Sequence, residues 1–131
     1  MATRERPLSP HLQVYRKQVQ MMTSITHRIT GIALAVGILG LVWGLLALAA
    51  GPERWAGFTA CAGSPLGLLV LFGFSWALAY HFLNGIRHLV QDAGNGFAIP
   101  DFIRSSWISI GGSIVLVVLA WAFVLMRWGQ V

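Results

Sequence analysis

Three long stretches without charged side chains constrain this chain more than any other feature of its sequence. Residues 29–50 and 105–126 carry no charge, and residues 55–86 are also uncharged, with the most apolar part at 65–80. A helix of about 20 apolar residues crosses a bilayer core of ~30 Å. Hydrophobic residues make up 56% of the 131 residues and charged residues only 10%. The sequence therefore predicts an all-α membrane protein with three transmembrane helices, at about 24–51, 64–92 and 104–128.

The expected helices have recognisable ends. Ser24 is expected to begin the first helix, and Pro52 to end it, because proline disfavours helix at the residue before it. Pro65 suits the first turn of the second helix, and the Gly-Asn-Gly run at 94–96 stops that helix. Residues 1–22 are then an N-terminal arm, residues 52–63 a short loop, and residues 23–131 the membrane-anchor domain.

The basic residues cluster at the edges of the expected membrane spans. Two of the nine, Arg54 and Arg127, lie on one side of the membrane in this layout. The other seven lie on the opposite side: Arg4, Arg6, Arg16, Lys17, Arg28, Arg87 and Arg104. The positive-inside rule places that richer side, with the N-terminus, in the cytoplasm. The net charge of +5 therefore comes from basic residues at the membrane edges. We expect no nucleic-acid partner.

The polar start of the chain bears on its compartment. Residues 1–22 show no cleavable signal peptide and lack the composition of a mitochondrial transit peptide. We therefore expect a bacterial inner membrane rather than a mitochondrial one. Cys61 is the only cysteine, which excludes an internal disulfide and a structural metal site built from cysteines.

A first polar constellation lies at the start of the first span. Ser24, His27, Arg28 and Gly31 are spaced i, i+3, i+4 and i+7, so they share one helical face. A hydroxyl, an imidazole and a guanidinium fork could hold the carbonyl of a quinone or the carboxylates of haem propionates. The alternative is that His27 and Arg28 only reach out to lipid headgroups.

A second constellation lies near the end of the second span, where residues 81–88 read HFLNGIRH. His81 and His88 share a face about 10 Å apart along the helix axis, so they cannot be the two axial ligands of one haem. Ionisable groups inside a membrane usually have a function, and His81 is a candidate iron ligand, with Gly85 leaving room for a macrocycle. The second axial ligand would come from another membrane subunit.

Other interpretations of these histidines stay open. His81 could be a hydrogen-bonded core histidine or line a water-filled cavity. His88 could reach a haem propionate or another chain, or it could extend to the membrane interface.

Three motifs together resemble the cytochrome b membrane-anchor subunits of succinate dehydrogenase, respiratory complex II. Residues 6–12 with Tyr15 match the family's RPLSPHLxxY arm, and residues 24–31 match its SxxHRxTG motif. Residues 81–94 match its HxxxGxRHLxxDxG motif. The resemblance covers nearly the whole chain, with no departure at the motif positions.

The resemblance implies a role for each matching residue. His81 would be an axial ligand of haem b, with the second ligand from a second small anchor subunit that completes the helix bundle. His27 and Arg28 would lie near the haem propionates, and so would His88. Ser24 and Arg28 would line the ubiquinone site, beside the iron–sulfur subunit.

The resemblance also implies a division of labour between subunits. Succinate oxidation would take place on a flavoprotein subunit, and no catalytic residue for it is expected here. The chain has no dinucleotide-binding fingerprint and no cysteine cluster. This agrees with the role of a membrane anchor, which contacts membrane lipids. Two other functions stay open: a small transporter or channel subunit with a proton path, and the anchor of a menaquinol:fumarate reductase.

Overall fold

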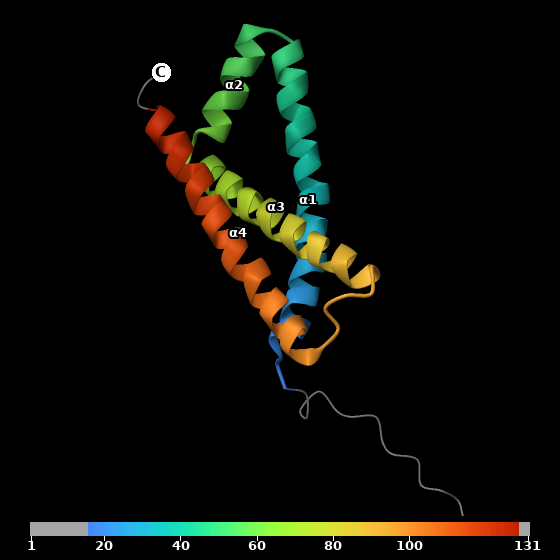
Figure 1. Ribbon diagram of the computed structural model, residues 1–131. Coiled ribbons are helices and arrows are strands. Elements are labelled where there is room, and N and C mark those ends of the chain that lie inside the picture. Colours follow the sequence, from blue (N-terminus) through green and yellow to red (C-terminus); the bar gives the residue numbers. More distant parts are fainter. Residues whose placement is uncertain (1–15, 129–131) are drawn as a thin grey trace, which may run out of the picture.

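The computed structural model describes residues 16–128, and within them the chain forms four α-helices (Figure 1). They are α1 (Val19–Ala49), α2 (Pro52–Ala62), α3 (Pro65–Asp92) and α4 (Ile99–Trp128). Of these, α1, α3 and α4 are long and apolar enough to cross a membrane. This confirms the all-α class and the three candidate spans. The expected arm motif at 6–12 and Tyr15 lie outside the described residues.

The first helix begins earlier than expected, at Val19 and not at Ser24. The extra turn is held by tertiary contacts, which a local sequence pattern does not reveal. The Tyr80 hydroxyl of α3 donates to the carbonyl of Thr23 at 2.9 Å, and the Thr23 hydroxyl lies 3.5 Å from that of Ser106 in α4. Part of the segment expected to be an arm therefore belongs to α1.

The segment expected to be a loop, residues 52–63, contains the helix α2. Gly51 has φ +107°, which reverses the chain, and Pro52 occupies the first helical turn, where its missing N–H costs nothing. The Phe58 ring of α2 packs edge-on against Trp43 of α1, with centroids 4.9 Å apart. Aromatic packing on α1 thus holds a helix that is too short to span the membrane.

The third span also starts before its expected position. Helix α4 begins at Ile99 and not near residue 104, because Pro100 is tolerated in the first turn of a helix. Helix α3 covers the expected range: the Ser64 hydroxyl accepts a hydrogen bond from the Gly67 N–H at its start. Gly94, with φ +84°, follows its end.

The helices pack with polar and small residues inside and large apolar residues outside. Helix α3 contacts both α1 and α4, and α1 also contacts α4; α3 runs opposite to the other two (Figure 1). Leucine and isoleucine side chains of α1 are largely exposed. Most of the buried side chains are polar: Thr23, Thr30, Asn84, Arg87, Gln91, Ser106, Ser109 and Ser113. This arrangement suits a lipid solvent, in which small and polar residues hold helices together.

Glycines on α1 receive aromatic rings from its neighbours. A Cβ added at Gly37 would overlap the Phe74 ring of α3, and one at Gly44 would lie 2.8 Å from Phe58. At Gly40, by contrast, it would meet no heavy atom of the described residues within 4 Å. Gly44, unlike Gly40, is therefore used for packing within the described chain.

Candidate functional site

Three histidines meet where α1 crosses α3. The His27 ring of α1 stacks on the His81 ring of α3, with centroids 3.9 Å apart and planes 9° from parallel. The His88 ring lies 5.0 Å from His27 at a steeper angle of 56°. The two constellations that the sequence suggested separately are therefore joined through His27.

The hydrogen bonds of His81 determine which ring nitrogen carries the proton. Its Nδ1 lies 3.1 Å from the carbonyl oxygen of His27 and 3.3 Å from the Thr30 hydroxyl. That hydroxyl lies 2.9 Å from each of the carbonyls of Thr26 and His27, toward which it can direct its one proton. The carbonyl of His27 can only accept, so in the neutral ring Nδ1 carries the proton and Nε2 keeps a free lone pair.

The close approach of His81 to α1 depends on a glycine. A Cβ added at Gly31 would lie 3.0 Å from His81 Cε1, closer than ordinary van der Waals contact. Gly85, expected to leave room for a macrocycle, faces α1 as well: a Cβ there would lie 4.0 Å from His27 Cε1. Gly31 thus leaves the space that the His81 ring occupies, whereas a Cβ at Gly85 would make only ordinary contact with His27.

A polar relay leads from His88 into the α3–α4 interface. Asn84 is fully buried; its Nδ2 lies 3.3 Å from His88 Nε2, and its Oδ1 accepts from Arg87 Nη1 at 3.4 Å. Arg87 Nε in turn donates to the Ser105 hydroxyl at 3.0 Å. Because the arginine can only donate, the amide oxygen faces Arg87 and the amide nitrogen faces His88.

The face that carries Ser24, His27, Arg28 and Gly31 is divided by the structure. His27 and Gly31 lie against α3, Ser24 is half-buried, and Arg28 is exposed. Within residues 16–128, the buried His27 Nδ1 has no hydrogen-bond partner. One part of the face therefore packs inside the chain, while Arg28 stays available to another molecule.

Sequence reasoning missed three contributors to this region. Thr30 holds His81 Nδ1, and its spacing of three residues from His27 on a helix was a signal for a shared face. Arg87, expected to mark the membrane edge, is buried with 6% of its surface exposed. The burial of Tyr80 had no local signal, because its partner Thr23 is 57 positions away in sequence.

Comparison with known proteins places the chain among respiratory membrane subunits. Residues 2–120 match the family model described as succinate dehydrogenase/fumarate reductase transmembrane subunit. The chain is 49% identical to the succinate dehydrogenase cytochrome b556 subunit of Paracoccus denitrificans over 87% of this chain and 88% of that protein. It is 39% identical to the subunit of the same name from Rickettsia prowazekii, over 89% and 91%.

A mitochondrial protein matches as well. The succinate dehydrogenase cytochrome b560 subunit of Mus musculus is 40% identical, over 88% of this chain and 67% of its own length. The family match at residues 2–120 includes α1, α3 and most of α4, together with both histidine motifs. The chain therefore belongs to the succinate dehydrogenase/fumarate reductase transmembrane subunit family, and within it to the succinate dehydrogenase cytochrome b subunits, the membrane anchors of complex II.

Proposed function

We propose that this anchor subunit binds haem b with His81 as one axial ligand and completes a ubiquinone-reduction site with Ser24 and Arg28. The observation that carries the proposal is the fixed tautomer of His81. Its Nδ1 proton is held by the carbonyl of His27 and the hydroxyl of Thr30, which leaves Nε2 free. Histidines that bind metals commonly hold their other ring nitrogen in this way.

The residues around His81 fit a haem group. His27 lies half-buried against His81, and its Nδ1 lacks a partner within residues 16–128. An unpartnered buried nitrogen suits a haem propionate, and so does the arginine at position 28. His88, oriented by Asn84, is a further candidate for a propionate contact. When bound, haem b supplies reversible one-electron storage. The second axial ligand would come from a second small anchor subunit.

The quinone is a substrate that takes up two electrons and two protons. Ser24 and Arg28 lie on α1 within one turn of His27, so a quinone near them would be close to the histidine cluster. The Ser24 hydroxyl can donate a hydrogen bond to a quinone carbonyl. Arg28, which is exposed, can stabilise negative charge that develops on the quinone oxygen near a low-dielectric region.

The proposed electron donors are other subunits. Electrons would pass from a flavoprotein through an iron–sulfur subunit docked at the end of the anchor where α1 begins. With Cys61 as its only cysteine, this chain offers no iron–sulfur ligand set. Both polar constellations lie at that end, which the distribution of basic residues places in the cytoplasm of a bacterial cell. Protons for the quinone would therefore enter from the cytoplasm.

The test of the ligand assignment compares two variants in the purified complex. His81→Leu removes the proposed ligand, and we expect the haem b absorption to be lost or shifted, while succinate oxidation by an artificial dye continues. Because His27 stacks on His81 and offers a substitute imidazole, the spectrum is also recorded for His81→Leu combined with His27→Gln. An unchanged spectrum in the double variant refutes the ligand assignment.

The quinone role is tested by Ser24→Ala. We expect ubiquinone reduction by succinate to fall about tenfold or more, while dye reduction stays near the wild-type rate, since only a hydrogen bond to the quinone is lost. Ser75→Ala is the matched control, because Ser75 is also a half-buried helical serine but lies on α3 beside Trp121. An equal loss of both activities in Ser24→Ala would count against the quinone role.

A further inference from the structure

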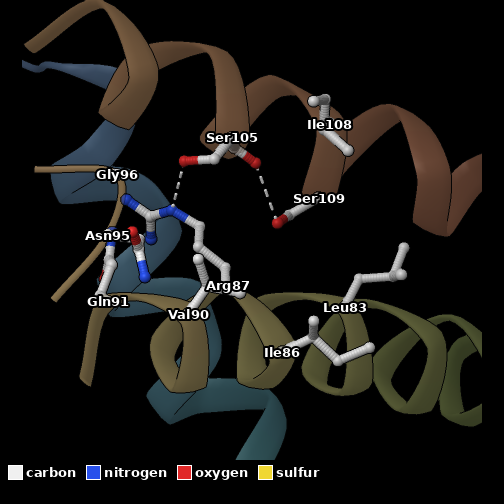
Figure 2. A pocket seen from close by; sticks show the side chains of 10 residues that line it. All are labelled: Leu83, Ile86, Arg87, Val90, Gln91, Asn95, Gly96, Ser105, Ile108 and Ser109. Atoms are coloured by element: carbon white, nitrogen blue, oxygen red, sulfur yellow. Dashed lines mark hydrogen bonds between the residues drawn. The ribbon is translucent and has the colours of Figure 1, made fainter. Parts of the chain in front are cut away.

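A cavity lies between α3 and α4, next to the loop that joins them. Its volume is about 220 Å³. Arg87 and Gln91 of α3 and Ser105 and Ser109 of α4 contribute its polar lining, and Figure 2 shows these side chains between the two helices. The histidine cluster lies at the α1–α3 crossing, so this cavity is separate from the proposed haem and quinone site.

Arg87 brings a positive charge into this cavity, and none of its hydrogen-bond partners among the described residues carries a counter-charge. The side chain is 6% exposed, and its hydrogen-bond partners, Ser105 and Asn84, are both neutral. Its Nη2 has no partner within residues 16–128. The Phe102 ring lies 4.4 Å from the guanidinium carbon, which provides a cation–π contact but no neutralisation. A buried cation is costly unless an anion pairs with it.

A second free donor lines the same cavity. Gln91 is 9% exposed, and its Nε2 also lacks a hydrogen-bond partner among the described residues. Arginine Nη2 and amide Nε2 can only donate hydrogen bonds. An occupant that satisfies both groups must therefore present acceptor oxygens, and the charge of Arg87 favours an anion.

The apolar walls of the cavity indicate that its occupant also has an apolar part. Ile86, Val90 and Ile108 line the cavity and are 43%, 47% and 58% exposed. They belong to candidate membrane spans and are not covered within the described chain, so these faces suit hydrocarbon chains. Asn95 and Gly96, from the loop between the spans, line the cavity as well. The cavity therefore lies at the edge of the membrane, at the level of lipid headgroups.

We propose that this cavity binds the phosphate group of an anionic phospholipid, with Arg87 and Gln91 as its donors. The acyl chains extend along the exposed faces of α3 and α4. Basic pockets between transmembrane helices at the membrane edge suit such headgroups. The site also bears on the rest of the anchor, because Arg87 holds Asn84, which in turn contacts His88.

The experiment uses the purified, detergent-exchanged complex stripped of native lipid. Phosphatidylglycerol, phosphatidylcholine with the same acyl chains, and inorganic phosphate are titrated separately. Thermal unfolding and lipid retention by native mass spectrometry are measured. We expect phosphatidylglycerol alone to stabilise the wild type. Arg87→Gln should weaken its binding about tenfold or more, because a charged hydrogen bond is lost, and Gln91→Leu should weaken it less.

The controls separate the site from general effects of charge. Arg127 is also an arginine beside an aromatic ring, but it is exposed near the other end of α4, so Arg127→Gln should bind phosphatidylglycerol like the wild type. If Arg87→Gln does not assemble, Gln91→Leu decides the question, since it leaves the charge in place. Equal lipid binding by wild type and both cavity variants would overturn the proposal. Equal stabilisation by inorganic phosphate or phosphatidylcholine would overturn it too, as would a protein carboxylate on Arg87 in a structure of the complex.

Discussion

His81 owes its orientation to three neighbours on one turn of α1. The carbonyl of His27 and the hydroxyl of Thr30 accept from its Nδ1, and Gly31 leaves the space in which the ring lies. The SxxHRxTG motif therefore does more than provide the polar face proposed for the quinone. Its threonine and glycine position the imidazole of His81, which belongs to the second motif.

A side chain at position 31 should displace His81, the proposed haem ligand, while leaving the imidazole itself unchanged. In Gly31→Val the new Cβ would lie 3.0 Å from His81 Cε1. This distance is short enough to be repulsive, so the ring must tilt or move. We expect a shifted haem b absorption or electron paramagnetic resonance signal in a complex that still assembles. Gly40→Val in the same helix is the control, since no described atom lies near that position. A wild-type spectrum in Gly31→Val would contradict this account of His81.

At the scale of helices, the packing of α1 on α3 depends on a ring that enters a glycine gap. Phe74 occupies the space beside Gly37 so closely that an added Cβ would overlap its ring. Gly37→Ala should therefore lower the stability of the complex by about 1–3 kcal/mol, the usual cost of overpacking a well-packed core. The measurement is the thermal midpoint of the purified complex.

A compensating change makes this prediction specific. Phe74→Leu shortens the side chain that faces Gly37, so the double variant should recover part of the loss caused by Gly37→Ala. Gly73→Ala is the matched control, because a Cβ there would meet no described atom within 4 Å. If the Gly37→Ala and Gly73→Ala complexes have the same thermal midpoint, the Phe74 ring does not set the distance between α1 and α3.

The helices also show how far sequence reasoning reaches. The three spans could be predicted because uncharged stretches of bilayer length are a local signal. Helix α2 could not, because its stability comes from Phe58 packing on Trp43 and Gly44 of another helix. The early start of α1 depends likewise on Tyr80 and Ser106. Contacts between distant segments therefore decide the element ends that composition leaves open.

The same limit applies to the candidate site. The motifs single out His27, His81 and His88, but the stacking of His27 on His81 follows from the crossing of α1 and α3. The burial of Arg87 was missed for a related reason. A basic residue near the end of a span usually reaches toward headgroups, whereas here Asn84 and Ser105 hold it between two helices.

At the scale of the whole molecule, the proposed orientation in the membrane can be tested with the chain's own cysteine. The proposed topology places the N-terminus and the α3–α4 loop in the cytoplasm and α2 on the opposite side. Cys61 is exposed on α2 and is the only cysteine of the chain. A membrane-impermeant maleimide added to intact spheroplasts should therefore label this subunit.

A moved cysteine provides the matched comparison. In Cys61→Ser combined with Asn95→Cys, the thiol lies in the α3–α4 loop, where residue 95 is exposed. This variant should stay unlabelled in spheroplasts and become labelled in inverted vesicles, with detergent-solubilised complex showing that both thiols react. The reverse pattern would invert the orientation of the anchor. It would also place the histidine cluster, Ser24 and Arg28 on the side away from the cytoplasm, which contradicts proton uptake from the cytoplasm at the proposed quinone site.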